Sequence, residues 1–126
     1  MTVLAVHNRL RRPADFRLVY AKGKSLANTW LVLYVLKRND GVQRFGFSIN
    51  RKCGKAVIRN KAKRHLRELC RRKIVEISCG FDAVFVARSQ IQKASWKELS
   101  VAMDDLLRRS RLLNEEMKGS TDAQDD

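Results

Sequence analysis

The chain has 126 residues, 44% of them hydrophobic, which is enough for one domain with a real core and argues against wholesale disorder. Its 27 Lys and Arg residues outweigh 13 Asp and Glu residues, and the formal net charge of +14 indicates a polyanionic partner. No apolar run of about 18 residues could span a bilayer, and the N-terminus lacks the long apolar stretch of a secretory signal. We therefore expect a cytoplasmic protein that does not enter the membrane.

The first third of the chain predicts a helix followed by strands. Pro13 suits a first helical turn and Gly23 a helix end, so a helix is expected between them. The apolar run 30–36 predicts a central strand, and one more short strand is expected between residues 25 and 28. Alternation along the run places Trp30, Val32, Tyr34 and Leu36 on one face and Leu31, Leu33 and Val35 on the other.

A turn signal and a second apolar strand come next. The Asn-Asp-Gly sequence at 39–41 predicts a tight turn, so the strand at residues 43–50 is expected to return antiparallel beside 30–36 as a hairpin. Alternation along this second strand gathers its apolar side chains on one face: Phe45, Phe47 and Ile49.

The most informative segment is residues 51–73, in which 11 of 23 residues are Lys or Arg and only Glu68 is acidic. An apolar stripe at spacings of four, four and three predicts a helix from about residue 55 to 73, docked along Ile58, Ala62, Leu66 and Leu69. Its other side is cationic and suited to phosphate oxygens. That side carries Arg59, Asn60, Lys63, Arg64, Arg67 and Arg71.

The last third predicts a strand, a helix and a tail. The apolar run 81–87 is typical of a buried strand. Ser95 and Glu98 form a capping box that opens a helix expected to reach Leu113, with Trp96 on its buried stripe. Residues 114–126 carry five acids against one lysine and have nothing to bury, so we expect a disordered acidic tail.

The basic helix face could serve nucleic acid, an acidic protein, a membrane surface or simply solvent. A solvated helix usually mixes both signs of charge, whereas this one concentrates like charges that repel at i, i+4. Nucleic acid is therefore the favoured partner. Phe16, Tyr20 and Tyr34 lie near basic residues, and the sequence leaves open whether they are core residues or platforms on which unpaired bases stack.

The sequence offers little for catalysis or metal binding by the protein itself. Its carboxylates are scattered over predicted caps, a turn, a strand and a helix, and His7 and His65 lack an evident catalytic partner. Cys53, Cys70 and Cys79 form no C-x-x-C pair, so we expect reduced structural thiols. We assign no catalytic and no metal-binding residue, and interpret residues 1–113 as a single RNA-binding domain.

Four motifs complete the sequence evidence. They are Phe16-x-x-Val19-Tyr20 after Arg9-Leu10-Arg11, the pair Leu33-Tyr34, the segment 47–52, and the segment 54–68. The last contains Lys-Ala-Val-x-Arg-Asn-Lys-x-Lys-Arg-x-x-Arg, a highly specific helical pattern. Together, over residues 8–113, they resemble the bacterial ribonuclease P protein component. Ala62 departs from the family, which usually carries a larger aliphatic residue there.

The resemblance implies an α+β fold, a two-layer α-β sandwich like that of RNA-binding ribosomal-protein domains. The implied order is α-β-β-β-α-β-α, with a left-handed βαβ crossover around the basic helix. It also implies a protein subunit of a ribonucleoprotein endoribonuclease that removes the 5′ leader from precursor tRNA. The RNA subunit carries the chemistry with magnesium that it mainly holds itself, and the protein alone is expected to be inactive.

The resemblance also implies two sets of site residues and two partners, the catalytic RNA and precursor tRNA, with no obligate protein partner. A cleft for the single-stranded leader would use Phe16, Tyr20, Tyr34, Arg51, Lys52 and Lys55. The catalytic RNA would be bound by Arg59, Asn60, Lys61, Lys63, Arg64 and Arg67. Two alternatives remain: a free-standing basic RNA-binding or ribosome-associated module without a catalytic assembly, and a protein-only nuclease.

Overall fold

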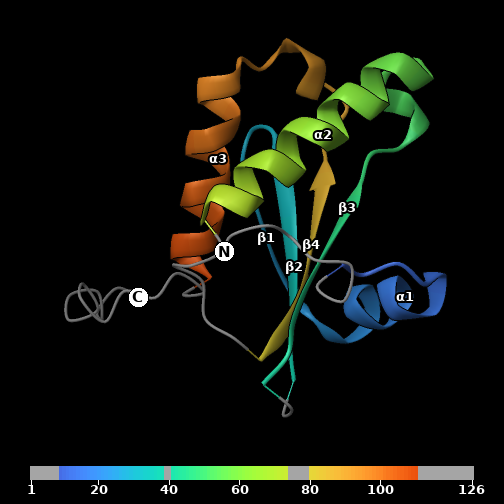
Figure 1. Ribbon diagram of the computed structural model, residues 1–126, viewed down its shortest axis with the longest axis vertical. Helices are drawn as coiled ribbons and strands as arrows, with labels where there is room; N and C mark the ends of the chain where they lie inside the picture. The colour runs from blue at the N-terminus through green and yellow to red at the C-terminus, as the bar shows by residue number, and fades with distance from the viewer. Residues whose placement is uncertain (1–8, 39–40, 74–79, 111–126) are drawn as a thin grey trace.

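The computed structural model describes residues 9–38, 41–73 and 80–110, and it has the predicted order of elements (Figure 1). The helices are α1 (Pro13–Lys22), α2 (Ala56–Lys73) and α3 (Trp96–Arg109). The strands are β1 (Lys24–Ala27), β2 (Leu31–Lys37), β3 (Gln43–Ser48) and β4 (Phe81–Ala87). Two short 3-10 turns, η2 (Arg51–Cys53) and η4 (Ile91–Lys93), precede α2 and α3. The predicted tail and the end of the last helix lie outside the described residues.

The four strands form one sheet in the order β1-β2-β4-β3. β2 pairs antiparallel with both β1 and β4, and β3 pairs parallel with β4. The predicted hairpin of β2 and β3 is therefore wrong, because β4 lies between them. The turn signal at 39–41 reflects only local sequence. β4 is buried at every position but Val86, and a strand is buried to this extent only when it has a neighbour on each side and both of its faces are covered. The left hand of the β3-α2-β4 crossover stays a prediction.

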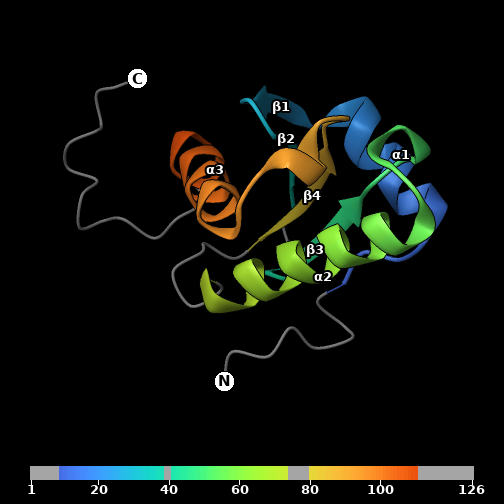
Figure 2. The same ribbon diagram turned by 90° about the horizontal axis from the view of Figure 1, so that it is seen from above.

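The two faces of the sheet are covered unequally. α2 and α3 lie on one face, and α1 packs on part of the other against β2 and β4 (Figures 1 and 2). The larger core cluster fills the α2 and α3 side and includes Leu31, Leu33, Phe45, Phe47, Phe85, Leu66, Leu69, Met103, Leu106 and Leu107. The smaller cluster under α1 contains only Leu10, Val19 and Val84. Much of that second face is therefore left partly open.

Strand alternation was predicted well from the sequence. Leu31, Leu33 and Val35 join the larger cluster, whereas Tyr34 and Leu36 pack beside the smaller one. The set of Phe45, Phe47 and Ile49 is also confirmed on the larger cluster. Trp30 is the exception, since it lies before β2 begins and packs against the larger cluster rather than with Tyr34.

The helix ends follow from their sequence signals. Pro13 occupies the first turn of α1, and the Gly23 N–H donates to Val19 O at the other end. A side chain at Gly23 would lie 2.7 Å from Val35 O, so only glycine lets the chain turn into β1 there. In α3, the Ser95 side chain accepts from Glu98 N and the Glu98 carboxylate from Ser95 N, as the capping box predicts.

The apolar stripes of α2 and α3 are largely confirmed. Ala62, Leu66 and Leu69 of α2 are buried, with Ile58 partly so. Trp96 is the error in α3: it is 37% exposed, because the first residue of the helix lies beyond the edge of the sheet-facing stripe.

The two cysteines in the described part, Cys53 and Cys70, are buried free thiols, and burial raises the pKa of Cys70 to about 12. Cys79 lies outside the described residues.

No described helix combines the length and hydrophobicity that crossing a bilayer requires.

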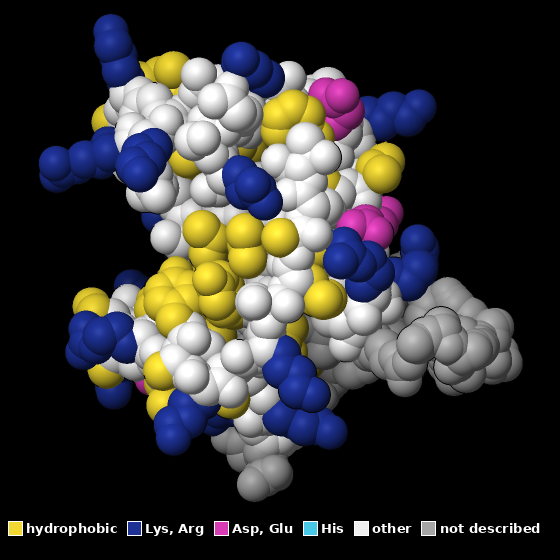
Figure 3. Space-filling view, turned by 180° about the vertical axis from the view of Figure 1, so that it is seen from behind, with side chains coloured by type: hydrophobic (Ala, Val, Ile, Leu, Met, Phe, Trp, Pro, Cys, Tyr) yellow, Lys and Arg dark blue, Asp and Glu magenta, His cyan; other side chains and the backbone are white. Residues whose placement is uncertain are grey.

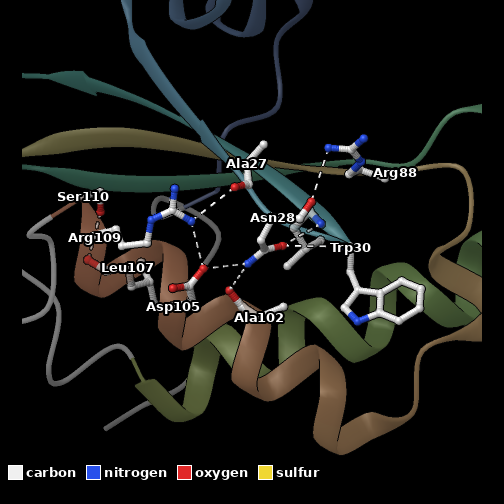
Figure 4. A network of polar contacts seen from close by, with 10 residues as sticks. Ala27, Asn28, Trp30, Arg88, Ala102, Asp105, Leu107, Arg109 and Ser110 are labelled. Carbon is white, nitrogen blue, oxygen red and sulfur yellow. Dashed lines mark hydrogen bonds and ion pairs between the residues drawn. The ribbon is translucent and has the colours of Figure 1, made fainter.

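A polar network fastens α3 to the turn between β1 and β2 (Figure 4). The Asn28 side-chain amide donates to Ala102 O and to Asp105 Oδ2, both at 3.0 Å, while its oxygen accepts from Leu31 N. Arg109 extends the network by donating to Asp105 and to a carbonyl of β1. One asparagine thus shapes the turn and positions the helix.

A second network joins α1 to the sheet through a buried carboxylate. Asp82 is 2% exposed and accepts two hydrogen bonds from Arg44, at 2.9 and 2.8 Å, and a third from Arg38. Arg44 also forms an ion pair with Asp15 of α1 at 3.4 Å. The hydrogen bond to Asp82 is the largest cause that raises the pKa of Arg44. Asp82 is therefore a structural residue whose removal leaves two partly buried guanidinium groups without their main counter-charge.

Asp82→Ala is expected to lower the free energy of unfolding by about 2–3 kcal/mol, because charged hydrogen bonds at a buried carboxylate are lost. Urea unfolding measures the effect. Asp104→Ala is the control with the same change of net charge, since the Asp104 side chain is 37% exposed and pairs with a single lysine, Lys73, so that its loss should cost less than the loss of Asp82. Equal losses in the two variants would contradict a special role for the Asp82 network.

Candidate nucleic-acid interface

Three aromatic side chains lie together on the partly open face of the sheet. The rings of Phe16 and Tyr20 on α1 have centroids 6.3 Å apart, and Tyr20 meets Tyr34 of β2 edge-on at 4.9 Å. Tyr20 is 37% exposed, while Phe16 and Tyr34 are half-buried. Tyr20 is therefore an exposed ring, whereas Phe16 and Tyr34 also pack against the smaller core cluster.

The hollow that these rings line depends on a glycine that the sequence analysis missed. A Cβ at Gly46 of β3 would lie 2.6 Å from the ring tip of Phe16 and 3.1 Å from Leu10 Cβ. The bare backbone of Gly46 therefore lets the tip of the Phe16 ring approach the strand closely. Leu36 and Val86 are partly buried around the same cluster and extend its apolar surface. A glycine between Phe45 and Phe47 in a predicted strand was the available signal.

We call the surface formed by Phe16, Tyr20 and Tyr34 the aromatic cleft, and three exposed cations lie in the segment that leads from β3 into α2. Arg51 and Lys52 lie in η2 and Lys55 just before α2, and all three are exposed. The Asn50 side chain accepts from Lys52 N at 2.9 Å, and Gly54 adopts a φ of 128° that favours glycine, so the approach to α2 has a defined shape. Figure 3 shows hydrophobic side chains in a hollow, and Lys and Arg side chains on the parts of the surface above and below that hollow.

The outer face of α2 is a second cationic surface. The predicted residues Asn60, Lys61 and Arg64 are exposed, whereas Arg59, Lys63 and Arg67 are half-buried. We call these six residues the α2 basic face. Arg59 Nε is buried and has no hydrogen-bond partner within the described structure. The Arg59 guanidinium thus forms no ion pair with a described residue.

The single acid of α2 does not neutralise this face. Glu68 accepts hydrogen bonds from Arg71 and, at 3.1 Å, from Arg72, and these bonds lower the pKa of Glu68 to about 2. The carboxylate is therefore ionised and directed toward the C-terminal turn of the helix. Within the described ranges, Arg64 and Arg67 have no carboxylate partner. The positive charge of the α2 basic face is left for an external anion.

The described residues contain no group of three His, Cys, Asp or Glu side chains placed to hold a metal ion. The carboxylate oxygens of Asp82 are occupied by Arg44 and Arg38. His65 lies against Trp96, with ring centroids 5.0 Å apart. Among the described residues, the two carboxylates that lie around one side chain, Asp15 and Asp82, are both paired with Arg44, whereas exposed rings and unpaired cations remain at the surface.

Known proteins share both the sequence and the fold. The family model described as Ribonuclease P matches residues 4–111. A ribonuclease P protein component of Alkaliphilus oremlandii is 43% identical over 107 residues, covering 85% of this chain and 94% of that protein. One from Clostridioides difficile is 40% identical over 102 residues, covering 80% and 90%.

Solved structures agree. The Staphylococcus aureus RNase P protein superposes with a TM-score of 0.78 at 30% identity, covering 85% of this chain and 98% of that one. The Thermotoga maritima protein superposes with a TM-score of 0.74 at 36% identity, covering 80% and 96%. Sequence motifs, α+β fold and surface chemistry thus agree with these matches, and the chain belongs to the ribonuclease P protein component family.

Proposed function

We propose that this chain binds two RNAs on two surfaces when it acts as the protein subunit of ribonuclease P, the endoribonuclease that removes 5′ leaders from precursor tRNA. The aromatic cleft holds the single-stranded leader, and the α2 basic face binds the catalytic RNA. The observation that carries the proposal is an exposed aromatic cluster together with a helix face whose cations pair with no carboxylate among the described residues. Its place of action would be the cytoplasm.

The cleft suits an unpaired strand for a physical reason. Bases of a single strand can stack on exposed rings, whereas those of a duplex are already stacked on one another. Tyr20 offers the most exposed ring, supported edge-on by Tyr34. Leader phosphates would then be bound by the three exposed cations that lead into α2: Arg51, Lys52 and Lys55.

The α2 basic face suits the backbone of a folded RNA. Guanidinium groups bridge phosphate oxygens, and a rigid helix presents them in a fixed row. Arg59, half-buried in this face, would contribute its guanidinium charge. The other residues of this contact would be Asn60, Lys61, Lys63, Arg64 and Arg67.

The protein's part in the reaction would be to position the substrate. Magnesium, held mainly by the RNA subunit, would activate the attacking water and stabilise the leaving oxygen when bound. The cleft would fix the leader in one register relative to the bond that is cut, which converts binding energy into orientation. A free-standing RNA-binding module, the alternative, would have no reason to distinguish precursor from mature tRNA.

Cleavage of a 5′-labelled precursor tRNA at low magnesium tests the proposal as a whole. The protein alone, a bacterial ribonuclease P RNA alone, and the two together are compared. Efficient cleavage at the mature 5′ end is expected only from the mixture, because neither component offers both the chemistry and the leader site. Failure to stimulate a competent RNA would favour the free-standing module, and cleavage by the protein alone would favour a protein-only nuclease.

Arg64→Ala is expected to weaken binding of the catalytic RNA, because it removes an exposed guanidinium group from the α2 basic face. The slope of log affinity against log salt should flatten by about 0.7–0.9 for each lost phosphate contact. Filter binding over a series of salt concentrations measures both quantities. Arg108→Ala, at an exposed position of α3, removes the same charge. Identical effects of the two variants would mean that only net charge matters.

Tyr20→Ala is expected to cost about 1–3 kcal/mol in holoenzyme affinity for precursor tRNA, the usual value of one stacked base, with affinity for mature tRNA unchanged. Gly46→Ala should also weaken leader binding, because its Cβ displaces the Phe16 ring. Leu18→Ala is the control, since Leu18 is exposed on the opposite side of α1. Equal losses for precursor and mature tRNA would show that these variants do not act through the leader.

A further inference from the structure

A second hollow lies over α2, on the other face of the sheet from the aromatic cleft. Arg9, before α1, and Trp96, the first residue of α3, contribute to its lining, and the remaining lining residues belong to α2. We call it the α2 hollow. Its volume of about 510 Å³ lies within the roughly 300–1,000 Å³ typical of pockets that hold small molecules.

One part of the α2 hollow is aromatic and held in place. The His65 and Trp96 rings meet edge-on, with centroids 5.0 Å apart, and the Arg72 guanidinium lies 5.4 Å from the centre of the Trp96 ring. The capping box at Ser95 fixes the start of α3 and hence the position of Trp96. A large ring that is 37% exposed, yet contacted by two side chains, is a preorganised stacking surface.

The rest of the lining is strongly cationic. Arg64, Arg67 and Arg71 of α2, together with Arg9, oppose the single carboxylate of Glu68. That carboxylate is already engaged by Arg71 and Arg72. Burial, helped by the charges of Lys61 and Arg64, lowers the pKa of His65, so the imidazole beside Trp96 stays neutral at pH 7. Apolar rings and uncompensated guanidinium groups therefore share one hollow.

We propose that the α2 hollow binds an unpaired nucleotide of the catalytic RNA, with the base against Trp96 and the phosphate on Arg64 and Arg67. A duplex would satisfy the arginines but would leave the ring without a partner, since its bases are stacked inside the helix. An acidic peptide would likewise use only the charges. The inference rests on the proposed binding of the catalytic RNA by the α2 basic face, and adds base stacking to it.

The direct test uses the fluorescence of Trp96 in the full chain. The sequence has two tryptophans, so Trp30→Phe leaves Trp96 as the only indole. Titration of this variant with a bacterial ribonuclease P RNA is expected to quench its emission, because a stacked base quenches an indole. Unchanged emission at saturating RNA would overturn the proposal. Equal quenching by polyglutamate would also overturn it, since charge alone would then suffice, as would quenching by precursor tRNA alone.

Trp96→Ala provides a second measurement. It should weaken binding of the catalytic RNA about tenfold, within the range of one stacked base. Val101→Ala is the matched control, because Val101 is also an exposed apolar residue of α3 and lies outside the hollow. Normal binding by Trp96→Ala, when Arg64→Ala binds weakly, would overturn the base site and leave the proposed function intact. Unaltered binding by Arg64→Ala as well would count against the proposed function itself.

Discussion

The parallel pairing of β3 with β4 is the constraint on which the rest of the molecule depends. Parallel neighbours cannot be joined by a tight turn, so the chain must cross the sheet from one end to the other. α2 makes that crossing, and its apolar stripe is buried because it lies on the sheet. The charged side of the helix must then face outward. The same crossing places η2 at the end of β4, where Cys53 Sγ donates to Ala87 O at 3.7 Å.

Unequal cover of the two sheet faces creates the surface on which we propose that the leader binds. α2 and α3 bury one face in a large core, whereas α1 covers only part of the other with a cluster of three buried residues. Aromatic rings on that second face are therefore packed on one side and exposed on the other. The Asp82 network, which joins Arg44 to Asp15, ties α1 to the sheet and so fixes the separation of the rings.

Most of the described acidic side chains form ion pairs within the protein, whereas many of the described basic side chains lie unpaired at its surface. Among the described residues, Asp82, Asp104, Asp105 and Glu68 all pair with basic side chains. The cations of the α2 basic face are left without such partners in the described ranges, although their mutual repulsion weakens the helix. Burial of the apolar stripe against the sheet offsets that repulsion. A polyanion that binds this face also relieves it.

The sequence by itself determined the elements, their caps, the buried stripe of α2 and the family, because hydrophobic period, capping residues and a dense basic motif are local properties. Tertiary structure alone decided the strand order and the exposure of Trp96. The turn signal predicted that β2 and β3 pair as a hairpin, but β4 lies between them. Burial of β4 between two strands depends on residues far apart in the sequence, which a local signal does not report. Likewise Gly46 acquires its meaning only from Phe16, thirty positions earlier in the chain, since contact between them requires the folded sheet.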